Sequence, residues 1–145
     1  AADGGRILRT SAEPGNLSLS RRFVAERVAA LGADPDAAYD MVQAVDESVT
    51  NIIQHGYRGL DGMVEVEVGA VGPSLEVRLR DHAPPFDPTR VPAPDLDVPI
   101  ERRPLGGMGV HLTRELMDDV RYGTAPGWTN ELTLVRAIGR TAPGR

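Results

Sequence analysis

The sequence contains neither cysteine nor lysine, and all 16 of its basic residues are arginines. Without cysteine, the chain cannot form a disulfide, a thiolate metal site or a cysteine nucleophile. Without lysine, it cannot build a P-loop or the eukaryotic-type kinase fold, because both place a lysine on the phosphates, and it cannot form a Schiff base. Phosphate chemistry in this chain would therefore depend on other groups.

The chain also lacks a positive charge excess and long apolar runs. Its net charge of -5 argues against nucleic-acid binding, which needs a basic face to neutralise phosphates. No apolar run approaches the roughly 20 residues that span a bilayer, and the first residues, AADGGR, lack the apolar segment of a signal peptide. We therefore expect a cytoplasmic protein that binds neither nucleic acid nor membrane.

The length and composition fit one globular domain over residues 1–145. The chain is 41% hydrophobic and 26% charged, which is typical of a folded soluble domain. A chain of 145 residues buries a substantial core but is too short for two ordinary domains. Every motif is therefore interpreted as part of the same fold.

Two helices are predicted in the first half of the chain. The first runs over residues 17–31, with Ser18 or Ser20 near its cap and Gly32 at its end. The second begins at the pair Asp34-Pro35, which supplies an N-cap and a proline at the first helical position, and it ends at Gly56.

Strands are predicted around these helices and after them. Residues 6–12 are extended, and MVEVEV and LEVRLR alternate with period two around a Gly72-Pro73 turn, which predicts a hairpin. A proline-rich lid at about 84–105, a helix over 109–117 and strands over 120–124 and 132–138 follow. This order predicts an α+β fold, a two-layer sandwich whose mostly antiparallel sheet is covered on one face by helices.

A row of polar residues follows the second predicted helix at intervals of four. It consists of Gln43, Glu47, Asn51 and His55, and each step turns it by about 40° around the helix axis. The row therefore drifts from the solvent side toward the apolar stripe, and Glu47 and Asn51 fall where a groove beside the core would lie. Taken alone, the row is more simply interpreted as an ordinary solvated helix face with i,i+4 contacts.

Two further features indicate a ligand site. If the alternating Leu75, Val77 and Leu79 point at the helices, Asp81 points the same way, and an inward carboxylate is costly unless it accepts hydrogen bonds. A turn residue at the end of a strand is the alternative interpretation of Asp81. Glycines over residues 106–109 open the third predicted helix, where free backbone N–H groups favour an anion.

Three motifs occur together in order. Residues 46–57, DESVTNIIQHGY, carry the E-x-x-x-N-x-x-x-H-G pattern of an N box, and residues 81–88 and 105–119 resemble two glycine boxes. Together they resemble the Bergerat-type ATPase fold of the histidine-kinase-like proteins. The phrase GGMGVHLTRELMDDVRY makes the chain similar to the anti-sigma-factor serine kinases of partner-switching systems, over roughly residues 5–138.

The resemblance implies an ATP and Mg²⁺ site and assigns its residues. Asn51 would bind Mg²⁺ through its side-chain oxygen, Asp81 would accept a hydrogen bond from the adenine amino group, and Glu47 would be the general base. Arg102 or Arg103 would supply positive charge from the lid. The full set of implied nucleotide contacts is Asn51, Asp81, Ala83, Phe86, Arg103, Gly106, Gly107, Met108, Gly109 and Val110.

Two positions depart from the family pattern. Ala83 stands where the first glycine box usually has glycine, and its methyl group would tighten the adenine pocket or change how the lid hinges. Asn130-Glu131 lies near the position where a Gly-Thr pair often closes the pocket. Both departures bear on ATP binding more than on the fold.

The resemblance implies an ATP-dependent protein serine kinase that acts as an anti-sigma factor. Its substrate would be a STAS-type anti-sigma-factor antagonist, and it would bind a sigma factor in the alternative complex and form a homodimer. The competing hypothesis is a catalytically silent adaptor, with or without nucleotide, that sequesters a regulatory partner. Glu47 favours the kinase, because an adaptor has no chemical need for a carboxylate one helical turn from a metal-binding amide.

Overall fold

The computed structural model of the chain describes residues 6–90, 97, 99 and 107–139. Five strands and three α-helices account for most of them, together with short 3₁₀ turns and one π-helical turn. In chain order the elements are β1 (Arg6–Ser11), η1 (Pro14–Asn16), α1 (Leu17–Ala30), α2 (Pro35–Asn51), η2 (Ile52–Tyr57), β2 (Met63–Val71), β3 (Ser74–Asp81), η3 (Pro88–Arg90), α3 (Gly107–Leu116), β4 (Asp119–Ala125) and β5 (Trp128–Ala137).

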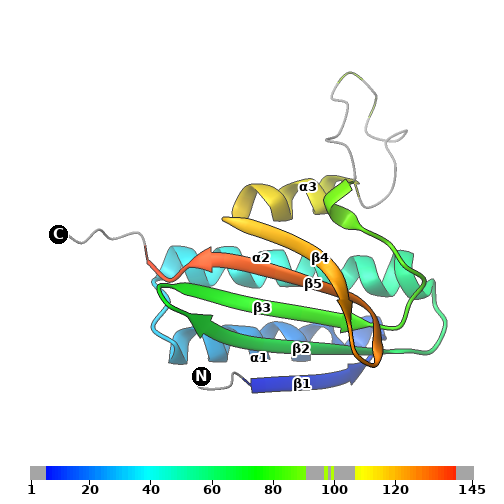
Figure 1. Ribbon diagram of the computed structural model, residues 1–145, viewed down its shortest axis with the longest axis horizontal. Coiled ribbons are helices and arrows are strands. Elements are labelled where there is room, and N and C mark those ends of the chain that lie inside the picture. The colour runs from blue at the N-terminus through cyan, green and yellow to red at the C-terminus, as the bar shows by residue number, and fades with distance from the viewer. Residues whose placement is uncertain (1–5, 91–96, 98, 100–106, 140–145) are drawn as a thin grey trace.

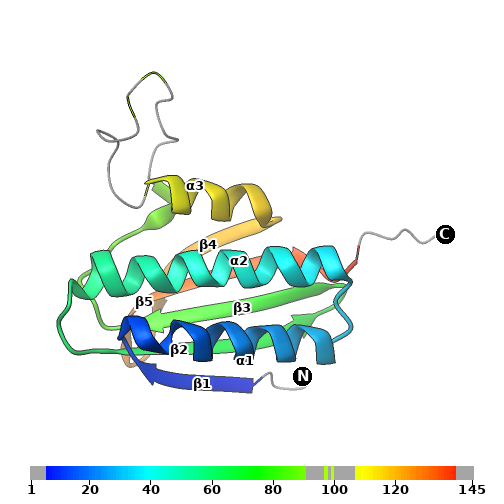
Figure 2. The same ribbon diagram turned by 180° about the vertical axis from the view of Figure 1, so that it is seen from behind.

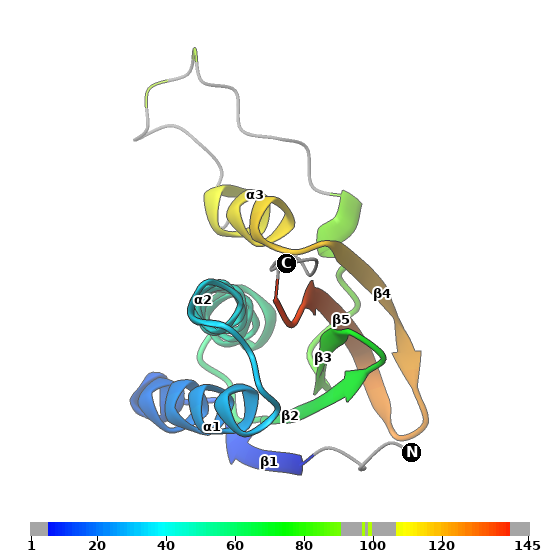
Figure 3. The ribbon, with the colours of Figure 1, turned by 90° about the vertical axis from the view of Figure 1, so that its left-hand side faces the viewer.

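The elements form two layers. The strands make one sheet in the order β1-β2-β3-β5-β4, and each neighbouring pair is antiparallel. All three α-helices lie on one face of this sheet, with α2 between α1 and α3 (Figures 1, 2 and 3). The predicted α+β sandwich is confirmed.

The core lies between the helices and the sheet, and strand alternation determines its composition. Every second residue of β3 is buried, and Val64, Val66 and Val68 of β2 follow the same period. Glu65, between them, is also buried, but on the opposite face of the sheet. The inward side chains of both strands are fully buried against apolar residues of α1 and α2. These core residues are Val24, Val28, Met41, Val45, Val49, Val64, Val66, Val68, Leu75, Val77 and Leu79.

The start of α2 is as predicted, but the α-helix ends at Asn51 rather than at Gly56. The Asp34 carboxylate accepts a hydrogen bond from the backbone N–H of Ala37 at 2.8 Å, and Pro35 is the first helical residue. After Asn51 the backbone continues as the π-helical turn η2, which ends at Tyr57. The chain then leaves the helix through Arg58 at φ 54° and Gly59 at φ 85°.

Three other predicted element ends were wrong. Neither Ser18 nor Ser20 caps α1: Asn16 precedes the helix without a side-chain cap, and Ser20 is buried inside it. Gly32 follows α1 at φ 89°, as expected of a helix end. The third helix begins at Gly107, two residues early, and β5 begins at Trp128 rather than residue 132.

The early start of β5 has a physical reason. Residues 129–131 of β5 are polar and carry no apolar alternation, but backbone pairing extends the strand through them, with β3 as far as Asn130 and with β4 at Trp128. In this register Glu131 lies opposite Arg80 and Asn130 lies opposite Asp81. The sheet thereby brings a polar pair together at the end of β3.

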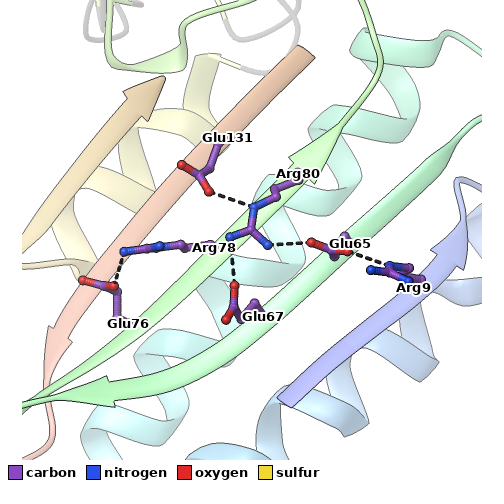
Figure 4. Close-up of polar contacts among 7 residues, drawn as sticks. All are labelled: Arg9, Glu65, Glu67, Glu76, Arg78, Arg80 and Glu131. Atoms are coloured by element: carbon purple, nitrogen blue, oxygen red, sulfur yellow. Dashed lines mark hydrogen bonds and ion pairs between the residues drawn. The ribbon is translucent and has the colours of Figure 1, made fainter. Parts of the chain in front are cut away.

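The helix-free face of the sheet carries a network of ion pairs (Figure 4). Arg80 binds three carboxylates, with 2.8 Å from Nε to Glu131, 2.8 Å from Nη2 to Glu67 and a short contact from Nη1 to Glu65. Arg9 also contacts Glu65, at 2.6 Å. Burial raises the pKa of Glu65, but the hydrogen bonds and charges of Arg9 and Arg80 outweigh burial and hold that pKa below its ordinary value.

A second ion pair lies in the layer between α2 and the sheet. The side chain of Arg136 on β5 is 2% exposed, and its Nε and Nη2 lie 3.1 and 3.0 Å from Oδ2 of Asp40 on α2. Arg136 also donates to the carbonyl of Ala137. This pair links the two layers directly.

The predicted lid is only partly described. Residues 84–90 leave the end of β3 and include η3, whose Thr89 donates two hydrogen bonds to the Asp87 carboxylate. Residues 91–96, 98 and 100–105 of the predicted lid lie outside the described residues. Within the described ranges, no helix combines the length and apolar character needed to cross a membrane.

Candidate functional site

Three backbone ends lie at the same end of the molecule. The C-terminal end of α2 with η2, the end of β3 and the N-terminal end of α3 lie on the same side in Figures 1 and 2. The structure thus brings together parts of the N box and both glycine boxes, which are far apart in the sequence. This end of the molecule is the candidate site.

Asp81 is the last residue of β3 and is 4% exposed, as strand alternation predicted. Its Oδ1 accepts hydrogen bonds from Nδ2 of Asn130 at 2.8 Å and from the N–H of Ala83 at 2.9 Å. Burial raises the pKa of Asp81 above its ordinary value, although these two hydrogen bonds and the charge of His82 act in the opposite direction. Its Oδ2 accepts no hydrogen bond from any described residue and remains available to a donor.

Asn130 is a site residue that sequence reasoning missed. Its Nδ2 donates to Asp81 and to the carbonyl oxygens of Ala83 at 3.0 Å and Pro84 at 3.4 Å. Its Oδ1 accepts from the N–H of Phe86 at 3.2 Å and from the hydroxyl of Tyr122. The sequence marked Asn130 only as a departure from a family pattern, since its contacts depend on the register between β3 and β5.

Tyr57, at the end of η2, ties the N box to the end of β3. Its hydroxyl donates to the carbonyl of Met63 at 2.7 Å and accepts from the N–H of His82 at 2.7 Å. Gly62 lies against the ring: a Cβ there would be 2.1 Å from Cε1 of Tyr57. The residue after Asp81 is therefore held in place by the helical turn that follows Asn51.

Ala83 is 3% exposed and packs against η2. A Cβ built on Gly56 would lie 3.1 Å from the Ala83 methyl carbon, so that methyl fills the space beside the glycine of the N box. Phe86, by contrast, has a side chain that is 54% exposed, and only its backbone N–H is tied to Asn130.

Glu47 and Asn51 lie one turn apart on α2, and both are half-buried. Within the part of the chain that the structure describes, neither side chain makes a hydrogen bond or an ion pair. Neighbouring Asp46, in contrast, is paired with Arg21 at 2.9 Å. Glu47 and Asn51 are thus available to a ligand, on the helix that packs beside α3 (Figure 3).

The glycines of the second box begin α3. Gly107 and Gly109 lie in its first turn, where backbone N–H groups have no partner within the helix. Arg114, further along α3, donates to the carbonyl of Thr89 at 2.9 Å and holds the helix to η3. Of the other predicted contacts, Arg103 and Gly106 lie outside the described residues, as do the side chains of Met108 and Val110.

The described residues fit a magnesium ion that is coordinated mainly by a bound phosphate group and water, with few protein oxygens. Among the described residues no group of three or more His, Asp or Glu side chains comes together as a metal cage. Mg²⁺ commonly binds through one or two protein oxygens and keeps phosphate oxygens and waters as its other ligands. The unengaged amide of Asn51 is a suitable single oxygen donor of this kind.

The chain is similar to known proteins over most of its length. The family described as histidine kinase-like ATPase domain matches residues 10–136. The chain is 32% identical over 107 residues to the serine-protein kinase RsbW of Bacillus cereus (strain B4264), covering 71% of this chain and 67% of the relative. The serine-protein kinase RsbW of Bacillus anthracis (strain CDC 684 / NRRL 3495) matches with the same identity and coverage.

A solved structure shares the fold. The crystal structure of the RsbU and RsbW domains of Rv1364c from Mycobacterium tuberculosis superposes with a TM-score of 0.64 at 21% sequence identity. The match covers 94% of this chain and 34% of that one, so this chain spans about a third of that larger protein. The family match over residues 10–136 and the identity to the RsbW kinases show that this chain belongs to the histidine kinase-like ATPase family, as an RsbW-like member.

Proposed function

We propose that the chain is an ATP-dependent protein serine kinase that acts as an anti-sigma factor and phosphorylates a STAS-type anti-sigma-factor antagonist. The names of its relatives, serine-protein kinase RsbW, support the kinase class. The observation that carries the proposal is Asp81, a buried carboxylate with one oxygen bound and one oxygen open. An open carboxylate oxygen in a water-poor site is suited to an amino group such as that of adenine.

The other predicted site residues would bind the rest of the nucleotide. Asn51 would hold Mg²⁺, which neutralises phosphate charge when bound. The N–H groups at the start of α3, around Gly107 and Gly109, would donate to phosphate oxygens. Arg103 and Gly106 remain predictions of the sequence, and with lysine absent an arginine would be the cation at the phosphates.

Glu47 would act as the general base. Its carboxylate would accept the proton of the substrate serine as the serine oxygen bonds to the γ-phosphorus and the bond from that phosphorus to the β-γ bridging oxygen breaks. ADP leaves with the bridging oxygen, and the phosphoserine product is formed. The half-buried position of Glu47, one turn from Asn51 and without a partner among the described residues, supports this role.

The first test separates binding from transfer at these two residues. We expect Asn51→Ala to abolish binding of Mg-ATP in calorimetry, and Glu47→Gln to keep binding but lower phosphate transfer from γ-labelled ATP to a STAS-domain antagonist about 100-fold or more. Gln43→Ala, one turn earlier in the same row, is the control and should change neither quantity. Normal phosphate transfer by the Glu47 variant would show that Glu47 is not the general base.

A silent adaptor is the second candidate, and two observations favour it. The Ala83 methyl packs against Gly56, and the Asn130 amide occupies one oxygen of Asp81 together with the carbonyls of Ala83 and Pro84. Both groups take space or hydrogen-bonding capacity beside the proposed adenine position. No binding at millimolar ATP would favour the adaptor, whereas saturable binding lost in Asn51→Ala and Asp81→Asn would favour the kinase.

A further inference from the structure

The carboxamide of Asn130 has its two ends in opposite environments. Nδ2 faces three acceptors, which are Oδ1 of Asp81 and the carbonyls of Ala83 and Pro84. Oδ1 faces two donors, the N–H of Phe86 and the hydroxyl of Tyr122. This division fixes the orientation of the amide, because a flipped amide would set donor against donor and acceptor against acceptor.

The same contacts fix the carboxylate of Asp81. Asn130 and the N–H of Ala83 both bind Oδ1, so the carboxylate cannot rotate without losing two hydrogen bonds. Both side chains are almost fully buried, Asp81 at 4% and Asn130 at 7% exposure, so water cannot easily replace these bonds. As far as the described residues go, Oδ2 is the carboxylate oxygen left to accept from a ligand.

We propose that Asn130 is a positioning residue for base recognition: it holds Asp81 with Oδ2 as the sole open acceptor and thereby selects a purine with a 6-amino group over one with a 6-oxo group. This inference rests on the proposed nucleotide-binding function. A 6-amino group donates to Oδ2, whereas a 6-oxo group would set a second acceptor against it. Such a buried acceptor discriminates because the wrong base leaves it unpaired.

Asparagine satisfies both sets of hydrogen-bonding partners at this position, the acceptors near its Nδ2 and the donors near its Oδ1. An aspartate of the same shape would set a carboxylate oxygen against Asp81 and two carbonyls, and the two carboxylates would share a proton or repel each other. An alanine would leave the acceptors of Asp81, Ala83 and Pro84 with one donor fewer. In either case Asp81 would no longer be held with a single open oxygen.

Asn130 also ties down the segment after β3 through Phe86, so its loss would weaken nucleotide binding in general. The ratio of affinities for two bases separates this effect from positioning. ATP and inosine triphosphate share the ribose and the triphosphate and differ at position 6 of the purine. A loosened segment lowers both affinities together, and a misdirected Asp81 lowers only the affinity for ATP.

The test is calorimetric titration of the full chain with Mg-ATP and with Mg-inosine triphosphate. We expect the unmodified chain to prefer ATP by roughly tenfold or more, and Asn130→Asp and Asn130→Ala to reduce the preference to within about threefold. Tyr122→Phe, which removes one donor to Oδ1 of Asn130 and leaves Asp81 untouched, should reduce the preference partially. Thr133→Val, an equally buried change on the other face of β5, is the matched control and should keep it.

The outcomes are distinguishable from one another. If the unmodified chain binds neither nucleotide, the proposed function fails and this inference fails with it. If it binds ATP and the Asn130 variants lose affinity for both nucleotides in parallel, the proposed function stands and the positioning role is overturned. If Asn130→Asp and Asn130→Ala do not fold, an unchanged ratio in Tyr122→Phe overturns the inference and a reduced ratio supports it.

Discussion

Asp81 is the residue at which we expect the stability of the fold and the proposed ligand binding to oppose each other. Its carboxylate is buried, which is unfavourable, and the described residues donate hydrogen bonds to only one of its oxygens. Groups with perturbed pKa values are concentrated at functional sites, where the cost is retained because the charge serves a ligand. The stability of the chain should therefore improve when this charge is removed.

We expect Asp81→Asn to stabilise the chain at pH 7.5 while abolishing ATP binding. The folded-state pKa of Asp81 is raised, so the ionised form costs stability above that pKa, and the cost disappears as the pH falls and the carboxyl is protonated. The difference in urea unfolding free energy between variant and unmodified chain should therefore be larger at pH 7.5 than at pH 4. A variant less stable than the unmodified chain at pH 7.5 would contradict this account.

Among the elements, the sheet has an unusual helix-free face. Its central strands carry Arg80 with three carboxylate partners, and the side chain of Glu65 is only 4% exposed beneath two arginines. Ion pairs on exposed surfaces contribute little, but a buried carboxylate that loses its partner is strongly destabilising. The contribution of each arginine to the stability of the chain therefore depends on whether its carboxylate partners are buried or exposed.

Arg80→Met should destabilise the chain by about 3 kcal/mol, because it leaves Glu65 with Arg9 alone and two more carboxylates unpaired. Arg78→Met is the control: that side chain is 44% exposed and pairs with one glutamate, so about 0–1 kcal/mol is expected. Urea unfolding at pH 7 measures both. Equal losses in the two variants would show that the network around Arg80 has no special role.

The same ion-pair network should make the folding stability of the chain depend on pH in the acidic range. The folded-state pKa of Glu65 is lowered from 4.5, so its stabilisation is fully present above pH 4.5 and is lost as the pH falls through the lower folded value. Glu65→Gln should therefore cost stability at pH 7 and cost progressively less below pH 4.5. A cost that is independent of pH would contradict the assigned ion pairs.

At the scale of the whole molecule, the ion pair between Arg136 and Asp40 joins the two layers. Arg136 is buried on the helix-facing side of β5 and contacts Asp40 of α2, where a hydrophobic contact would be expected. Breaking such a pair from one side leaves a buried charge without compensation, whereas replacing both members by apolar residues is often neutral. Once one of the two charged residues is present, the fold therefore requires the other, because a lone buried charge would destabilise the contact between helix and sheet.

We expect Asp40→Ala to destabilise the chain by about 3–5 kcal/mol, since it leaves Arg136 buried and unpaired. The double variant Asp40→Leu with Arg136→Met should recover most of that loss. Thermal unfolding of the three proteins, with Asp46→Ala as a control at an exposed ion pair of α2, measures the effect. A double variant as unstable as the single one would argue that the pair has a further structural role.

Much of this protein was determined by its sequence alone. The period of two in the hairpin strands, the Asp34-Pro35 cap and Gly32 predicted elements that the structure contains, because these signals act between residues close in the chain. The same alternation predicted that Asp81 faces inward. The three ordered motifs indicated the family that the comparisons then showed.

Only the tertiary structure decided the contacts that depend on distant pairing. The extension of β5 through polar residues, the contacts of Asn130 and the link between Arg136 and Asp40 all follow from strand register and layer packing, which local patterns do not encode. The π-helical turn after Asn51 likewise has no local signature, although it brings Tyr57 to the end of β3. Local sequence determined the elements and the motifs, and long-range pairing determined how the carboxylate at the candidate site is held.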